Sequence, residues 1–120
     1  MQDSEPRTVV AAVHDLMFGS RIRAAAEHAS VTVLFVRSAA ELLAKAPAAH
    51  LILLDLETHW LDAPASITAL RADASTAGIQ IVAFGAHVDG AALVAAREAG
   101  ADRVLARSAF VTVLPELMRG

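Results

Sequence analysis

The sequence predicts an α/β domain in which a five-stranded parallel sheet carries helices on both faces. Five short apolar runs recur along the 120 residues, and a segment with helical periodicity follows each of them. The runs are nearly continuous in hydrophobic residues, which is typical of parallel strands that are buried on both faces. Hydrophobic residues make up 56% of the chain, which is enough to cover such a sheet from both sides.

The predicted strands are short and rich in Val, Leu and Ile, as buried strands usually are. The third is almost purely aliphatic until it ends at Asp55, and Gly85 ends the fourth. The five predicted strands are residues 8–13, 31–36, 50–55, 79–84 and 102–106.

Capping and turn residues mark the predicted helices. Ser38 with Glu41 three residues later is typical of a capping box, and Pro64 is favoured in the first turn of a helix. Gly100 is typical of a helix end, whereas Pro115 either kinks the last helix or marks its effective start. The five predicted helices are residues 19–29, 38–45, a segment from 64, 91–98, and a segment from 108.

Connection rules predict how these elements are arranged. Right-handed crossovers favour a doubly wound sheet, and the flavodoxin-like strand order 2-1-3-4-5 is common at this size. We expect residues 1–7 to form a flexible leader and residues 8–120 to form a single domain.

Composition excludes several classes of protein. The chain has no cysteine, so disulfides and thiol catalysis are excluded. A net charge of −3 and a pI near 5.9 provide no basic surface for nucleic acid or an anionic membrane. No stretch approaches the roughly 20 apolar residues that span a bilayer. With no signal peptide at the polar start of the chain, we expect a cytoplasmic protein.

Chemically active side chains follow several predicted strands. Ligands of open α/β sheets bind beyond the carboxyl ends of the strands, where the strand order reverses. That rule selects His14 and Asp15 after the first strand, Asp55 after the third, Gly85 after the fourth and Arg107 after the fifth. Two neighbouring carboxylates repel each other, and a hard cation such as Mg2+ relieves that repulsion. An aspartate beside Mg2+ is a competent nucleophile towards a phosphoryl group, whose charge Arg107 would offset.

Simpler roles compete with these assignments. Asp15 is also a good helix cap, Asp55 a good loop residue, and Arg107 an ordinary solvated charge. A transition-metal site is another alternative, for which the candidate ligands are His14, His59 and His87.

Three motifs resemble the receiver domain of response regulators of bacterial two-component systems, the CheY-like family, over residues 8–118. They are Val13-His14-Asp15, the strand Leu51 to Leu56 (LILLDL), and the turn Ala99 to Asp102 (AGAD). The resemblance implies that Asp55 accepts the phosphoryl group. It also implies that Asp55, Asp15 and the backbone carbonyl of Glu57 hold Mg2+, and that a histidine kinase or phosphotransfer protein is the donor. Such a protein is a signalling module and not a metabolic enzyme.

The chain departs from the receiver pattern at five positions. His14 replaces an acidic residue and is a weaker metal ligand, and Arg107 replaces a Lys. Gly85 stands where a switch Thr or Ser is expected, Val104 where a switch aromatic is expected, and Ser108 where a Pro is expected. The groups that accept a phosphoryl group are thus mostly retained, whereas those that report its arrival are missing. We therefore expect a Thr at position 85 to strengthen any phosphorylation-linked change.

Three functions follow from this pattern. The first is a working single-domain receiver with Mg2+-assisted chemistry at Asp55. The second is a pseudo-receiver, a docking module that works without phosphorylation. The third, a small-ligand-binding flavodoxin-like domain, is disfavoured because no glycine-rich phosphate loop is present. The output target is not indicated. A homodimer through the last helices is conceivable, although the apolar residues there are expected to be core, namely Val104, Leu105, Val111 and Leu114.

Overall fold

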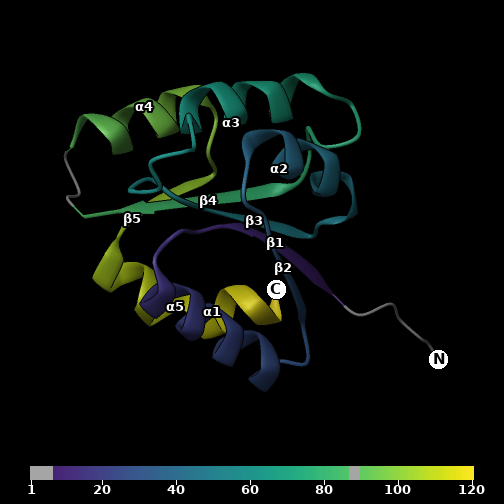
Figure 1. Ribbon diagram of the computed structural model, residues 1–120, viewed down its shortest axis with the longest axis vertical. Helices are drawn as coiled ribbons and strands as arrows, with labels where there is room; N and C mark the ends of the chain where they lie inside the picture. Colours follow the sequence, from purple (N-terminus) through teal and green to yellow (C-terminus); the bar gives the residue numbers. More distant parts are fainter. Residues whose placement is uncertain (1–6, 87–89) are drawn as a thin grey trace.

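The computed structural model describes residues 7–86 and 90–120, and its centre is a five-stranded parallel sheet (Figure 1). The strand order is β2-β1-β3-β4-β5, so the predicted fold class and strand order are confirmed. Neighbouring strands are parallel throughout, with Val10 opposite both Leu34 and Ile52. The strands are β1 (Thr8–Ala12), β2 (Thr32–Phe35), β3 (Leu51–Asp55), β4 (Gln80–Gly85) and β5 (Arg103–Ala106).

Helices cover both faces of this sheet. In Figure 1, α1 and α5 lie together on one face, and α2, α3 and α4 lie on the other. The helices are α1 (Leu16–His28), α2 (Ala39–Lys45) with the short 3-10 helix η1 (Ala46–Ala48), α3 (Ala63–Ala72), α4 (Ala91–Ala99) and α5 (Arg107–Arg119).

Successive side chains of the inner strands point to opposite faces and supply two cores. Val9 and Leu53 pack under α1 and α5, whereas Val10 and Ile52 pack under α2, α3 and α4. All four are fully buried, which explains why the strands are hydrophobic runs without alternation.

Caps fix where the helices begin. Helix α1 begins at Leu16, three residues earlier than predicted, because the Asp15 side chain accepts hydrogen bonds from the first turn. Ser38 caps α2 by accepting from Glu41 N, but the Glu41 carboxylate accepts from Arg37 N and not from Ser38 N. The predicted capping box is therefore only half formed. Pro64 lies in the first turn of α3, as predicted.

The last helix differs from its prediction. Helix α5 begins at Arg107, so Pro115 lies inside it and does not mark its start. Pro115 is exposed, and the missing backbone N–H is tolerated because the helix is held by its buried face. Phe110 is fully buried on this face of the helix. The four residues considered for a homodimer are buried or pack against the two cores, as expected: Val104, Leu105, Val111 and Leu114.

Arg71 of α3 joins three segments at the amino-terminal edge of the sheet. Its guanidinium donates to the carbonyls of Gly100, Ala77 and Ile79 at 2.8–3.0 Å. It also pairs with the Asp102 carboxylate at 2.7 Å. Gly100 has a φ of 121°, which a glycine adopts without strain. One side chain thus closes the turns before β4 and β5.

No helix in residues 7–86 and 90–120 is long and apolar enough to cross a membrane. The predicted leader lies mostly outside these residues. Arg7, its last residue, accepts a hydrogen bond from Thr32 N and donates to Leu117 O.

Candidate functional site

Asp55 is the charged group at the carboxyl end of the sheet that is most deeply buried, with only 1% of its surface exposed. It ends β3, whose four preceding residues are fully buried, so the strand carries its carboxylate into a covered position. Its Oδ1 accepts a hydrogen bond from Glu57 N at 2.9 Å. Its Oδ2 has no hydrogen-bond partner in the described part of the chain. A buried acceptor without a partner is costly, which indicates a role other than stability.

Burial raises the pKa of the Asp55 carboxyl, because the charged form loses water. The Glu57 N–H and the Arg107 charge act in the opposite direction and do not offset the burial. A raised pKa means that the folded protein binds the proton more tightly than the unfolded chain does. The contribution of Asp55 to stability is therefore largest at low pH and is lost as the pH rises from about 4 through the raised pKa.

We accordingly expect Asp55→Asn to be more stable than the parent at pH 7 in Mg2+-free buffer. The advantage should shrink as the pH falls through the raised pKa, because the parent carboxyl then becomes neutral too. Urea denaturation of both proteins over a series of pH values measures it. Glu98→Gln, which removes one negative charge at an exposed position of α4, is the control and should show no such gain. A stability gap between Asp55→Asn and the parent that is independent of pH would contradict the assignment.

Arg107 lies between the two carboxylates of the site. Its terminal nitrogens are 3.6 Å from Asp55 Oδ2 and 3.8 Å from Asp15 Oδ2. These are ion-pair distances and are too long for hydrogen bonds. The guanidinium also stacks over the Phe18 ring, with Cζ 4.5 Å from its centroid. Phe18 in turn packs on Phe84, so the aromatic core supports the position of the cation.

Asp15 has two roles in the structure. Its Oδ1 caps α1 by accepting from Met17 N at 2.8 Å and Phe18 N at 3.1 Å. Its Oδ2 remains available towards Arg107. The alternative that Asp15 is a helix cap is therefore correct, and it is compatible with a place in the charged site.

His14 contacts Thr58 and His59 and makes no hydrogen bond or ion pair with the carboxylates of Asp15 and Asp55. Its backbone N–H donates to Thr58 Oγ1 at 3.2 Å, and its ring meets the His59 ring edge-on, with centroids 4.8 Å apart. The third residue of the suggested transition-metal site, His87, lies outside the described residues. Among residues 7–86 and 90–120, no three His, Asp or Glu side chains are grouped to hold a metal ion.

Leu93 occupies the space beside Gly85. A Cβ at position 85 would lie 2.8 Å from Leu93 Cδ1, closer than van der Waals contact permits. Leu93 is itself buried at 2% exposure on α4. The hydroxyl expected at this position is thus not merely missing, because an apolar side chain fills its place. Gly85→Thr alone would have to displace the Leu93 side chain. The threonine is therefore expected to strengthen a phosphorylation-linked change only when Leu93 is also replaced by a smaller residue.

The chemistry of the donor atoms decides whether Mg2+ suits this site. Asp55 Oδ2 and Asp15 Oδ2 are carboxylate oxygens that accept no hydrogen bond from the described residues, and hard cations prefer such ligands. The Arg107 guanidinium lies within ion-pair distance of both of them, and its single positive charge leaves one negative charge uncompensated. The two oxygens therefore fit a divalent cation, provided that Arg107 moves away from one of them.

Comparison with known structures defines the fold. The receiver domain of a sensor histidine kinase from Pseudomonas aeruginosa PAO1, described with magnesium in its active-site cleft, matches with a TM-score of 0.78 and 16% identity over 97% of this chain and 100% of that one. A response regulator from Hahella chejuensis matches with a TM-score of 0.79 and 19% identity, over 93% and 92% of the chains. For the chemotaxis response regulator CheY4 of Vibrio cholerae the values are 0.79 and 16%, over 96% and 98%.

The chain has the receiver fold of response regulators. No protein-family model matches the sequence, and no curated protein sequence does. Within the receiver fold, Asp55, Asp15 and Arg107 come together at the carboxyl edge as the sequence predicts, and Gly85 ends the adjacent strand β4. Glu57 lies two residues after Asp55, and its side chain accepts a hydrogen bond from Ala86 N at 3.4 Å.

Two residues of the site were not predicted. Phe18 stacks beneath Arg107, and its place three residues after the Asp15 cap is the one signal that could have indicated it. Leu93 fills the space at Gly85, and it lies in an ordinary apolar stripe, so no sequence signal distinguishes it.

Proposed function

We propose that this chain is a signalling module that accepts a phosphoryl group on Asp55 from a histidine kinase or phosphotransfer protein, inside the cell. The observation that carries the proposal is the buried Asp55 Oδ2, which has no hydrogen-bond partner within the described residues and faces Arg107. A carboxylate oxygen without a donor retains its lone pairs for attack. The receiver fold adds support, since Asp55 ends the strand at which the strand order reverses.

The transfer places Asp55 Oδ2 as the nucleophile. This oxygen attacks phosphorus, the phosphorus–nitrogen bond of a phosphohistidine breaks, and the imidazole that leaves takes up a proton from solvent. Asp55 Oδ1 stays bound to Glu57 N, which fixes the orientation of the carboxylate. Arg107 is placed to offset the charge that the acyl phosphate adds.

Asp15 and Asp55 would hold Mg2+ together with the carbonyl of Glu57, and the cation would supply charge neutralisation for the phosphoryl oxygens. Helix capping keeps Asp15 in position for that role. The Arg107 guanidinium stacks on Phe18, with Cζ 4.5 Å from the ring centroid, and this contact holds the arginine side chain in position.

Intact-protein mass spectrometry after incubation with acetyl phosphate and Mg2+ tests the proposal. The parent should gain the mass of one phosphoryl group, and Asp55→Asn should gain none. Asp62→Asn, which changes an exposed carboxylate on the neighbouring loop, should behave as the parent does. An unmodified parent, or equal labelling of Asp55→Asn, would refute the proposal.

A second function is favoured by one specific observation. Arg107 already pairs with both carboxylates, and Leu93 already fills the switch position, so protein side chains occupy the site without metal or phosphate. That arrangement suits a docking module whose partner binding is independent of phosphorylation. In that case, a partner captured by the parent would be captured equally by Asp55→Asn, and no phosphoryl group would be gained.

A further inference from the structure

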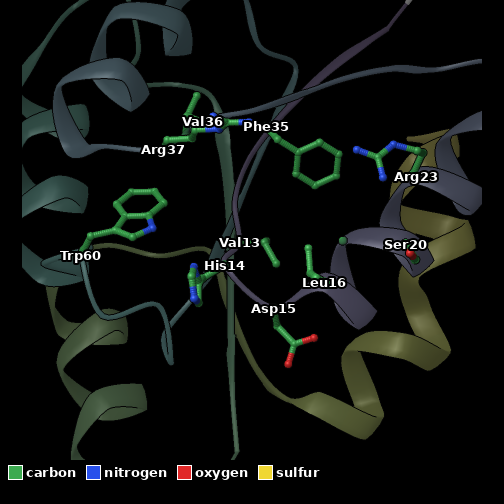
Figure 2. Close-up of a pocket in the computed structure, with 11 residues that line it drawn as sticks. Val13, His14, Asp15, Leu16, Ser20, Arg23, Phe35, Val36, Arg37 and Trp60 are labelled. Carbon is green, nitrogen blue, oxygen red and sulfur yellow. The ribbon is translucent and has the colours of Figure 1, made fainter.

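A pocket lies beside the charged site, between the carboxyl ends of β1 and β2 (Figure 2). Its volume is about 630 Å³, within the range of small-molecule sites. Residues of the β1–α1 loop, the end of β2 and the β3–α3 loop line it. Figure 2 shows Trp60 on one side and Arg23 on the other, with Val13 and Phe35 between them.

The pocket combines flat aromatic surfaces with positive charge. Trp60, the only tryptophan of the chain, is half-buried against the second core and lines the pocket with its ring. Arg23 lies over the Phe35 ring, with Cζ 4.7 Å from the centroid, so its guanidinium is held at the rim. Arg37 lines the same pocket from the β2–α2 loop.

The charges of the lining residues favour an anion. Neither Arg23 nor Arg37 has a carboxylate within ion-pair distance in the part of the chain that the structure describes. The one acidic lining residue, Asp15, is engaged by the α1 cap and by Arg107. Two exposed arginines therefore line the pocket without a carboxylate partner among the described residues, and guanidinium binds phosphate well.

We propose that this pocket binds a small phosphorylated molecule with a planar ring, of the class of the nucleoside monophosphates. The ring would stack on Trp60 or Phe35, and the phosphate would bind Arg23 and Arg37. Aromatic stacking and bidentate contacts from Arg to phosphate are the two interactions that such a molecule offers. Asp55 does not line the pocket, which shares only His14 and Asp15 with the candidate site, so ligand binding there is distinct from phosphoryl acceptance on Asp55.

Fluorescence of Trp60 and isothermal titration calorimetry test this inference. The full chain is titrated with AMP, GMP, CMP and UMP, and with adenosine and inorganic phosphate as half-ligands. We expect saturable binding of at least one monophosphate, and weaker binding of adenosine and of phosphate alone. Arg37→Ala and Arg23→Ala should each weaken it by about tenfold, the usual effect of losing a charged hydrogen bond.

Arg21→Ala is the matched control, because Arg21 is exposed on the same helix as Arg23 but does not line the pocket. It should bind as the parent does. Circular dichroism verifies that each variant is folded, and calorimetry reports binding even where Trp60 is unperturbed. No saturable binding of any of the four monophosphates at millimolar concentration overturns the inference. Equal affinity of the parent and both Arg variants also overturns it. Neither result bears on whether Asp55 is phosphorylated.

Discussion

Arg71→Ala should lower the free energy of unfolding by about 3 kcal/mol, which corresponds to a drop of roughly 10 °C in melting temperature. The guanidinium makes four hydrogen bonds, three to backbone carbonyls and one to Asp102. Each bond contributes roughly 1 kcal/mol net, and the side chain is only 22% exposed, so solvent replaces them poorly. Urea denaturation followed by circular dichroism measures the loss.

Two further variants make the Arg71 prediction specific. Arg71→Lys should recover less than half of the loss, because an ammonium group cannot reach the carbonyls of Gly100, Ala77 and Ile79 at once. Arg97→Ala, on the exposed face of α4, should change stability by less than about 0.5 kcal/mol. If Arg71→Ala were no more costly than Arg97→Ala, Arg71 would not connect the turns before β4 and β5.

Gly85→Thr should destabilise the protein by about 1–3 kcal/mol, the usual cost of overfilling a packed core. The new Cβ would lie 2.8 Å from Leu93 Cδ1, so the buried Leu93 side chain has to shift to make room for it. Gly78→Thr is the matched control, because a Cβ there meets nothing within 4 Å. It should change the free energy of unfolding by less than about 0.5 kcal/mol.

The combination of Gly85→Thr with Leu93→Ala separates this clash from other effects of the threonine. Leu93→Ala alone should cost about 2–5 kcal/mol as a cavity mutation. Thr at position 85 should then cost at least about 1 kcal/mol less than it does in the parent, because it enters the vacated space. Chemical denaturation of the four proteins gives this coupling. Strictly additive costs would show that Leu93 does not occupy the place of the threonine.

The fold was predictable because each element has a local cause in the sequence. The strands are continuous apolar runs, and their order follows from the handedness of the crossovers. The predicted helix boundaries were wrong where the same residues are compatible with two different helix starts. Pro115 is permitted inside α5 because the buried face of that helix, with Phe110 and Leu114, holds it in place. The predicted start of α1 was three residues late, although Asp15 was considered as a helix cap, because the apolar Leu16 and Met17 at the start of the helix are exposed and do not follow the buried periodicity.

The residues of the candidate site were predictable from the sequence, but the contacts that Arg107 makes within it were not. Topology alone brings Asp15, Asp55 and Arg107 to one edge of the sheet. That Arg107 lies between the carboxylates depends on stacking with Phe18, a contact between distant parts of the sequence that no spacing rule describes. The filling of the space at Gly85 by Leu93 likewise depends on how α4 packs against the end of β4.

Chemical reduction followed by peptide sequencing shows which carboxylate carries the acyl phosphate. The parent is incubated with acetyl phosphate and Mg2+, the acyl phosphate is reduced with borohydride, and the digested protein is sequenced by tandem mass spectrometry. We expect Asp55 alone to be converted, in the peptide that contains β3. An absence of conversion in the parent, or conversion of another carboxylate such as Asp62 or Glu57, would contradict it.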